Sequence, residues 1–196
     1  MNNLKFIISD TQYLKISFDS MNKDDCEVCV HCDIDYVDEE KNISVRFGYD
    51  TISSFCYFIA RSERIQKLLR GENVFDEKIA NDLGFEWNQY YEGLMQKTDI
   101  IEKYHFEGNT HKQIQPYFES WLYNNKEGNI IFEITPFYPW HNVTKKANPE
   151  KISYKKWIKD YKAVVKTIIP KENLKQWITQ AEEVAKNYKL NLNFTK

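Results

Sequence analysis

The chain has 196 residues, of which 42% are hydrophobic and 15% aromatic, and its formal net charge is −2. This length and composition exclude a disordered or low-complexity protein and favour one core, hence a single domain over residues 1–196. The longest apolar run, residues 55–60, is far shorter than the ~20 residues of a membrane-spanning helix. The N-terminus lacks a basic segment followed by a long apolar one, so we expect a cytoplasmic protein that does not insert into a membrane.

Four short segments at the N-terminus alternate apolar and polar residues as β-strands do. They are residues 4–9, 13–19, 26–36 and 43–49. The last segment predicts one face made of Ile43, Val45, Phe47 and Tyr49. Because the connecting segments are short and polar, the pattern predicts an antiparallel β-meander.

The period changes to that of a helix after Thr51. Residues 51–71 predict a helix that ends at Gly71, and a shorter one is expected over 76–83, ended by Gly84. Residues 85–111 are ambiguous, although their apolar positions fit a helix. These positions are Trp87, Tyr90, Tyr91, Leu94 and Met95.

The C-terminal half predicts a second β-hairpin and two helices. The hairpin turns at residues 124–128 and is closed by Pro136 and Pro139. The first helix begins after Ser153 and stops before Pro170, and its apolar stripe consists of Tyr154, Trp157, Ile158, Tyr161, Val165 and Ile168. The stripe of the second consists of Leu174, Trp177, Ile178, Ala181, Val184 and Tyr188. The predicted fold class is therefore α+β, with a C-terminal αα-hairpin.

Three cysteines, Cys26, Cys29 and Cys32, have the C-x-x-C-x-x-C spacing of a metal or iron–sulfur site. In a strand, however, Cys26 and Cys29 would lie about 10 Å apart on opposite faces. Thiolates on one zinc ion must lie about 3.8 Å from one another. The segment between residues 23 and 47 contains no glycine or proline, the residues that would let a loop fold around a metal. We therefore interpret these residues and Cys56 as structural, with no metal and no cofactor.

The same strand has an acidic outer face. The candidate residues for binding a partner on this face and in the turn after it are Glu27, His31, Asp33, Asp35, Asp38, Glu39 and Glu40. Acidic residues at alternate strand positions repel one another and do not stabilise the sheet. They either protect the edge and keep the protein soluble, or they dock a basic partner.

Charge is unevenly distributed along the chain. Residues 1–50 contain 11 acidic and 5 basic residues, whereas residues 141–196 contain 5 and 13. Lys155, Lys159, Lys162 and Lys166 recur at helical spacing, as an anion-binding strip or simply a solvated helix face. Lysine outnumbers arginine, which disfavours nucleic acid as the partner.

The segment TPFYPWH, residues 135–141, contains two further candidates for partner binding, Tyr138 and Trp140. The alternative is a loop that packs on the core.

For catalysis, the sequence contains no glycine-rich nucleotide loop and no nucleophile motif, and the pair His105 and Glu107 lacks the zinc-binding cysteines of a deaminase. A small hydrolase or transferase with dispersed acidic and histidine residues remains the enzymatic alternative.

The segment SWLYNNKEGNIIFEITPFYPWH, followed by YKKWIKDYK and LKQWITQAEE, resembles bacterial immunity proteins of contact-dependent and polymorphic toxin systems. The resemblance covers the last 80 or so residues. It implies a cytoplasmic inhibitor, not an enzyme, that binds and neutralises one cognate toxin domain, and it carries over no catalytic residues. The acidic N-terminal surface is compatible with this reading, since a basic nuclease toxin would be attracted to it.

Overall fold

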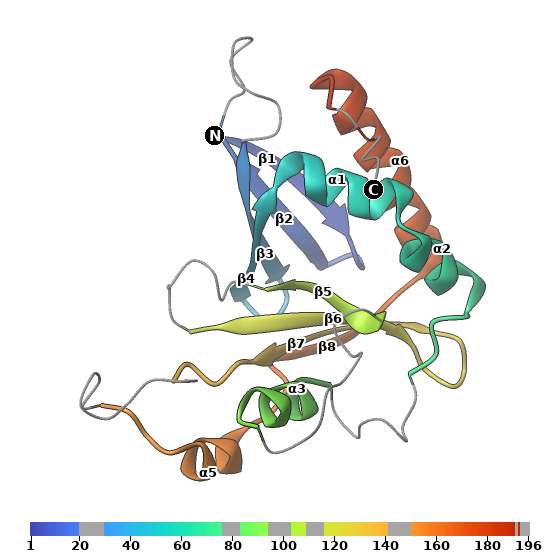
Figure 1. The fold of residues 1–196 in the computed structure, drawn as a ribbon. Helices are drawn as coiled ribbons and strands as arrows, with labels where there is room; N and C mark the ends of the chain where they lie inside the picture. Colours follow the sequence, from blue (N-terminus) through green and yellow to red (C-terminus); the bar gives the residue numbers. More distant parts are fainter. Residues whose placement is uncertain are drawn as a thin grey trace.

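The computed structural model describes residues 1–19, 30–75, 83–93, 103–108, 116–140, 150–190 and 192. Over these ranges the chain forms two four-stranded antiparallel sheets together with helices, which confirms the predicted α+β class. Figure 1 shows helices α1, α2 and α6 on one side of the second sheet and helices α3 and α5 on the other side.

The first sheet is the predicted meander. Its strands are β1 (Asn2–Ile7), β2 (Gln12–Phe18), β3 (His31–Asp38) and β4 (Ile43–Thr51), in that order. Cys32, Ile34 and Tyr36 of β3 are buried on one face, as the alternation predicts. Residues 26–29, with Cys26 and Cys29, lie outside the described residues.

Strand β4 departs from strict alternation at Phe47. Asp35 pairs with Arg46 while the preceding Ile34 pairs with Gly48, so Phe47 is the extra residue of a β-bulge. Phe47 stays buried, but Tyr49 turns to the outer face, opposite Asp33. The prediction that Tyr49 shares a strand face with Ile43, Val45 and Phe47 is therefore wrong.

The helix expected over residues 51–71 is two helices, α1 (Ile52–Arg61) and α2 (Glu63–Arg70). Ser62 separates them because its backbone is extended, with φ −70° and ψ 137°, and its hydroxyl accepts a hydrogen bond from Ile65 N at 3.2 Å. A serine that caps a new helix thus ends the old one. Gly71 ends α2 in the left-handed conformation, as predicted, with φ 75°.

Gly84 does not end a helix but lies in α3 (Leu83–Tyr91). A Cβ atom at this position would overlap Thr135 Oγ1 and the Tyr161 hydroxyl, so glycine permits close packing of α3 on the sheet. Trp87, Tyr90 and Tyr91 are helical, whereas residues 76–82 and 94–102 lie outside the described residues.

The second sheet contains the predicted hairpin, β6 (Phe118–Asn124) and β7 (Ile130–Pro136). Two strands that the sequence did not predict flank it. They are β5 (His105–Gly108), next to β6, and β8 (Val165–Ile169), next to β7.

The predicted αα-hairpin is wrong in its first half. The helix at Ser153 is only one turn, α5 (Tyr154–Trp157), followed by the 3-10 turn η2 (Ile158–Asp160). The chain then extends into β8, where β-branched side chains prefer a strand and Val165 and Ile169 are buried against the sheet. The second predicted helix is confirmed as α6 (Lys171–Asn187).

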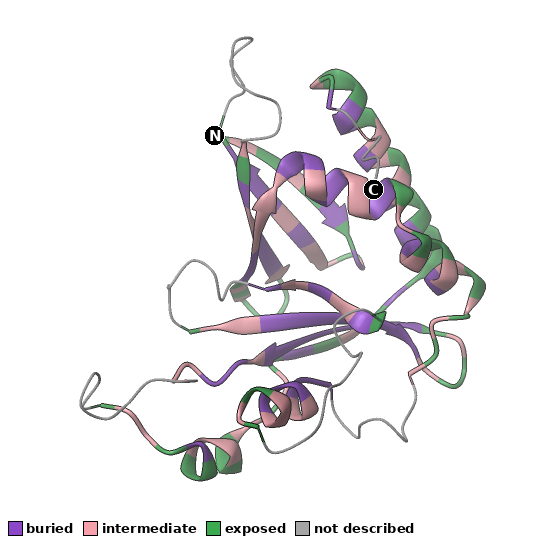
Figure 2. Cartoon of the chain, in the orientation of Figure 1, coloured by how far each residue is buried: buried purple, intermediate pink, exposed green. Residues whose placement is uncertain are grey.

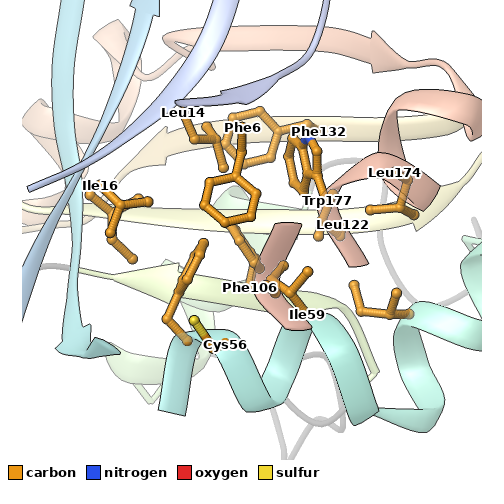
Figure 3. Packing of buried hydrophobic residues seen from close by; sticks show 14 of the residues in the cluster. Phe6, Leu14, Ile16, Cys56, Ile59, Phe106, Leu122, Phe132, Leu174 and Trp177 are labelled. Carbon is orange, nitrogen blue, oxygen red and sulfur yellow. The ribbon is translucent and has the colours of Figure 1, made fainter. Parts of the chain in front are cut away.

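One main core joins both sheets and the helices α1, α2 and α6 (Figure 3). Phe6 of β1 contacts Phe55 of α1 and Trp177 of α6, and Phe132 of β7 contacts Phe47. Figure 2 shows α6 buried on one side and exposed on the other. A smaller aromatic core lies under α3 on the second sheet. No helix among the described residues is long and apolar enough to cross a bilayer.

Candidate functional site

The acidic outer face of β3 is partly neutralised within the protein. Arg46 of β4 donates from Nε to Asp35 Oδ1 at 2.8 Å and from Nη2 to Asp35 Oδ2 at 3.2 Å. Its Nη1 also lies 2.8 Å from Asp33 Oδ2. Asp35 is only 6% exposed. The register brings the arginine beside both aspartates, so this face offers less free negative charge than the sequence alone indicates.

Asp38 is not on the surface. It is 1% exposed, and its carboxylate accepts hydrogen bonds from Lys41 N at 3.0 Å and from Gln12 Nε2 at 3.1 Å. The Lys41 backbone bond is the main cause that lowers the pKa of Asp38. Asp38 therefore stabilises the β3–β4 turn, and its expected partner-binding role is corrected. Glu39 and Glu40 next to it are exposed.

The remaining candidates lie in different places. His31 is exposed and stacks on Tyr49, with ring centroids 4.8 Å apart. Tyr138 is 0% exposed and donates its hydroxyl to the Ile152 carbonyl at 2.6 Å, so its expected role in partner binding is also corrected. Trp140 is half-buried, which means that residues 135–140 pack on the protein. Glu27 lies outside the described residues.

The proposed lysine strip does not form on a helix. Lys155 belongs to α5, Lys159 to η2 and Lys166 to β8, while Lys162 lies between the last two elements. Lys166 Nζ lies 3.1 Å from Glu133 Oε2. The four side chains are exposed but share no helical face.

A cluster that the sequence analysis did not assemble lies where β4 meets β5 and β6. These strands contact each other although β4 and β5 are the edge strands of different sheets. We call this set of residues the seam cluster: Asp50, Arg64, His105, Glu107 and Glu119. Four come from strand residues 50, 105, 107 and 119, and Arg64 comes from α2.

Asp50 and Glu107 form a hydrogen-bonded carboxyl pair. Burial is the main cause that raises the pKa of Asp50, and it raises the pKa of Glu107 well above its ordinary value. The hydrogen bond between the two groups lowers the pKa of Asp50 and raises that of Glu107. Two carboxyl groups in contact favour a state in which they share one proton, and the raised pKa of Glu107 favours that group as its holder.

His105 and Glu119 form a second pair behind the first. Nε2 of His105 lies 2.6 Å from Glu119 Oε2, and Glu119 is 7% exposed. Arg64 supplies positive charge near Glu107, and its guanidinium lies 4.6 Å from the centroid of the Phe58 ring. Burial lowers the pKa of Arg64 to about 10, so it remains charged at neutral pH.

Two glycines make room for the seam cluster. A Cβ atom at Gly108 would overlap Glu119 Oε2, and one at Gly48 would lie 3.1 Å from Glu107 Cβ and 3.0 Å from Ile34 Cβ. Neither glycine has a positive φ, so both serve close approach and not a turn. The side chains of Glu107 and Glu119 occupy the space that a Cβ atom at position 48 and at position 108, respectively, would need.

This arrangement has two chemical capabilities. A carboxyl pair with one shared proton can donate or accept a proton, and it can also bind a cation in place of that proton. Within the part of the chain that the structure describes, no three or more His, Cys, Asp or Glu residues are grouped so as to hold a metal ion. Cys32 and Cys56 are buried free thiols.

The sequence contained a partial signal for the seam cluster. His105 and Glu107 alternate as residues on one strand face do, and Glu119 is the polar residue of the predicted hairpin strand. Their approach to Asp50, however, depends on contact between two sheets.

No family profile matches the sequence, and neither a curated protein nor a solved structure matches the chain.

Proposed function

We propose that the protein is a non-enzymatic inhibitor that binds and neutralises a basic toxin domain in the cytoplasm, with the seam cluster at the centre of its docking site. The observation that carries the proposal is the excess of carboxyl groups over cationic groups in the seam cluster, counted over the residues that the structure describes. Asp50, Glu107 and Glu119 are partly or fully buried beside Arg64 and His105, and burial raises the pKa of Glu107 well above its ordinary value.

A buried carboxyl group that lacks a cationic partner costs free energy, and it lowers this cost by staying protonated. An arginine or lysine of the partner would supply the missing charge, and Glu107 would then release its proton. The stacked rings of His31 and Tyr49 lie beside Asp50, since His31 pairs with Thr51 and its charge lowers the pKa of Asp50. Exposed aromatic surface next to carboxylates is a favourable site for a basic side chain.

The partly exposed Asp33 of the acidic face extends this site. Asp33 pairs with Tyr49 across the strands, and its side chain is 15% exposed beside Arg46. The resemblance of the C-terminal segments to immunity proteins supports a toxin domain as the partner. The 11 acidic residues among residues 1–50 would favour encounter with a basic one.

The experiment measures binding to the protein encoded by the gene next to that of this chain, because immunity genes normally lie beside the genes of their toxins. Glu107→Gln keeps the shape of the protonated side chain but cannot ionise. We expect it to weaken binding at least tenfold, equivalent to about 1.4 kcal/mol. Glu183→Gln, on the exposed side of α6, is the matched control and should bind like the wild type. Wild-type affinity should also rise as the pH rises through the folded-state pKa of Glu107, which burial raises well above its ordinary value, and Glu107→Gln should lose this dependence. Equal affinity of all three proteins would refute the site.

A second candidate is a small hydrolase or transferase, supported by the ability of the Asp50–Glu107 pair to transfer a proton. Stoichiometry separates the two functions. An inhibitor that acts by binding abolishes toxin activity at about one molecule per toxin molecule, whereas an enzyme inactivates the toxin at far lower ratios. Inactivation well below equimolar amounts, lost in Glu107→Gln, would establish the enzyme in place of the inhibitor.

A further inference from the structure

An aromatic cluster lies on the face of the second sheet that is turned away from the main core. Its centre is Tyr138, whose ring centroid lies 5.6 Å from that of Trp140, 5.3 Å from that of Tyr154 and 5.4 Å from that of Trp157. We call these four residues the aromatic box. Figure 1 places α5, which contributes Tyr154 and Trp157, on the same side of the sheet as α3.

Two polar atoms of the aromatic box are buried and have no hydrogen-bond partner among the described residues. They are the hydroxyl of Tyr154 and Nε1 of Trp140. Tyr154 as a whole is 9% exposed. Buried hydroxyls almost always form a hydrogen bond, so one that makes none with any described residue favours a ligand that can bond to it.

The charge around the Tyr154 hydroxyl is negative. After burial, the largest causes that raise the pKa of Tyr154 are the carboxylates of Glu92 and Glu86, and Glu92 also raises the pKa of Tyr138. Negative charge beside aromatic faces disfavours an anionic ligand and favours a cation.

The protein itself places a cation beside two other members of the aromatic box, Tyr138 and Trp140. Lys151 Nζ lies 5.9 Å from the centroid of the Tyr138 ring and donates a hydrogen bond to the Trp140 carbonyl at 3.3 Å. An ammonium group can therefore reach the aromatic box without leaving its charge unsolvated. Lys151 is half-buried, so its side chain can swing away to solvent.

We propose that the aromatic box is a binding site for an alkylammonium group, with Lys151 as the internal competitor. The ligand donates a hydrogen bond to the Tyr154 oxygen, and its charge takes the position that Lys151 Nζ occupies beside the fully buried Tyr138. The site is separate from the seam cluster and does not depend on the function proposed above. A free amine and a lysine side chain of another protein share this chemistry.

The test titrates the full-length protein with n-butylammonium chloride and follows tryptophan fluorescence and the indole N–H signals in NMR spectra. Sodium chloride at equal ionic strength is the control titration. We expect saturable binding that Lys151→Met strengthens severalfold, because the competitor is removed. Tyr154→Phe should weaken binding at least fivefold without lowering the melting temperature, since the removed hydroxyl has no partner among the described residues.

The matched control variant is Tyr13→Phe. The Tyr13 ring has Lys5 Nζ at 4.0 Å but does not belong to the aromatic box, so its replacement should leave the affinity unchanged. A second titration with Nα-acetyl-lysine amide identifies the source: equal or tighter binding indicates a lysine side chain, and weaker binding indicates a free amine. The proposal is overturned if neither the wild type nor Lys151→Met shows saturable binding, or if Tyr154→Phe binds the probe like the wild type.

Discussion

Replacing Trp177 by alanine should be among the most damaging single changes in the main core. Trp177 is 1% exposed, its ring centroid lies 5.9 Å from that of Phe6, and Nε1 donates to the Ile7 carbonyl at 2.7 Å. Truncating a buried tryptophan to alanine costs about 3–5 kcal/mol. Loss of the hydrogen bond contributes about 1 kcal/mol of this, which places the expected loss in the upper half of the range.

Urea denaturation measures this loss. At an m-value of about 2 kcal/mol/M, Trp177→Ala should move the midpoint down by about 2 M, whereas Trp177→Phe should lose only about 1–2 kcal/mol. Trp157→Ala is the comparison, because the sequence placed both rings in a buried stripe but Trp157 is only half-buried on α5. A loss under 1 kcal/mol for Trp177→Ala, or an equal loss for Trp157→Ala, would refute the burial argument.

Three further predictions concern charge and thiol burial. Glu107 has a folded-state pKa above its unfolded value of 4.5, so the free energy of unfolding should fall as pH rises from about 4.5 through the folded-state pKa. In urea denaturation at a series of pH values, Glu107→Gln should show a smaller fall than the wild type. Parallel curves for the two proteins would contradict the prediction. Burial raises the pKa of Cys32 and raises that of Cys56 to about 12. In a variant whose other two cysteines are replaced by serine, we expect a thiol reagent to label Cys32 and Cys56 only after urea unfolds the protein. Rapid labelling of the folded variant would contradict the burial of these thiols. A double-mutant cycle with Arg46→Ala and Asp35→Ala should give a coupling energy of about 1 kcal/mol, modest because 44% of the Arg46 side chain is exposed. A coupling of zero would contradict the prediction that this pair stabilises the fold.

The sequence predicted those elements whose periodicity has a single interpretation. The meander and α6 follow from alternation and from helical spacing around Leu174 and Trp177. Strand β8 could not be found in this way, since Val165 and Ile168 are spaced for a helix as well. The β-branched run was the better guide, because Ile168 is 51% exposed and Ile169 is buried, as strand pairing with β7 requires.

The candidate site was less predictable than the fold because it depends on pairs of distant residues. Alternation correctly put Asp33 and Asp35 on one strand face, but only the register past the Phe47 bulge brings Arg46 beside them. Asp50 and Glu107 are 57 positions apart, in different sheets. A single sequence contains no local pattern that pairs them.

The bond from Trp177 to the Ile7 carbonyl, with a second from Asn173 Nδ2 to the Ile8 carbonyl at 2.9 Å, has a consequence for protein synthesis. Strand β1 is translated well before α6, the helix whose Trp177 contacts Phe6. Until α6 is translated, the N-terminal sheet has an uncovered apolar face, and such faces promote aggregation. We therefore expect nascent chains stalled before residue 171 to bind chaperones, and chains stalled after α6 has left the ribosome to bind them less.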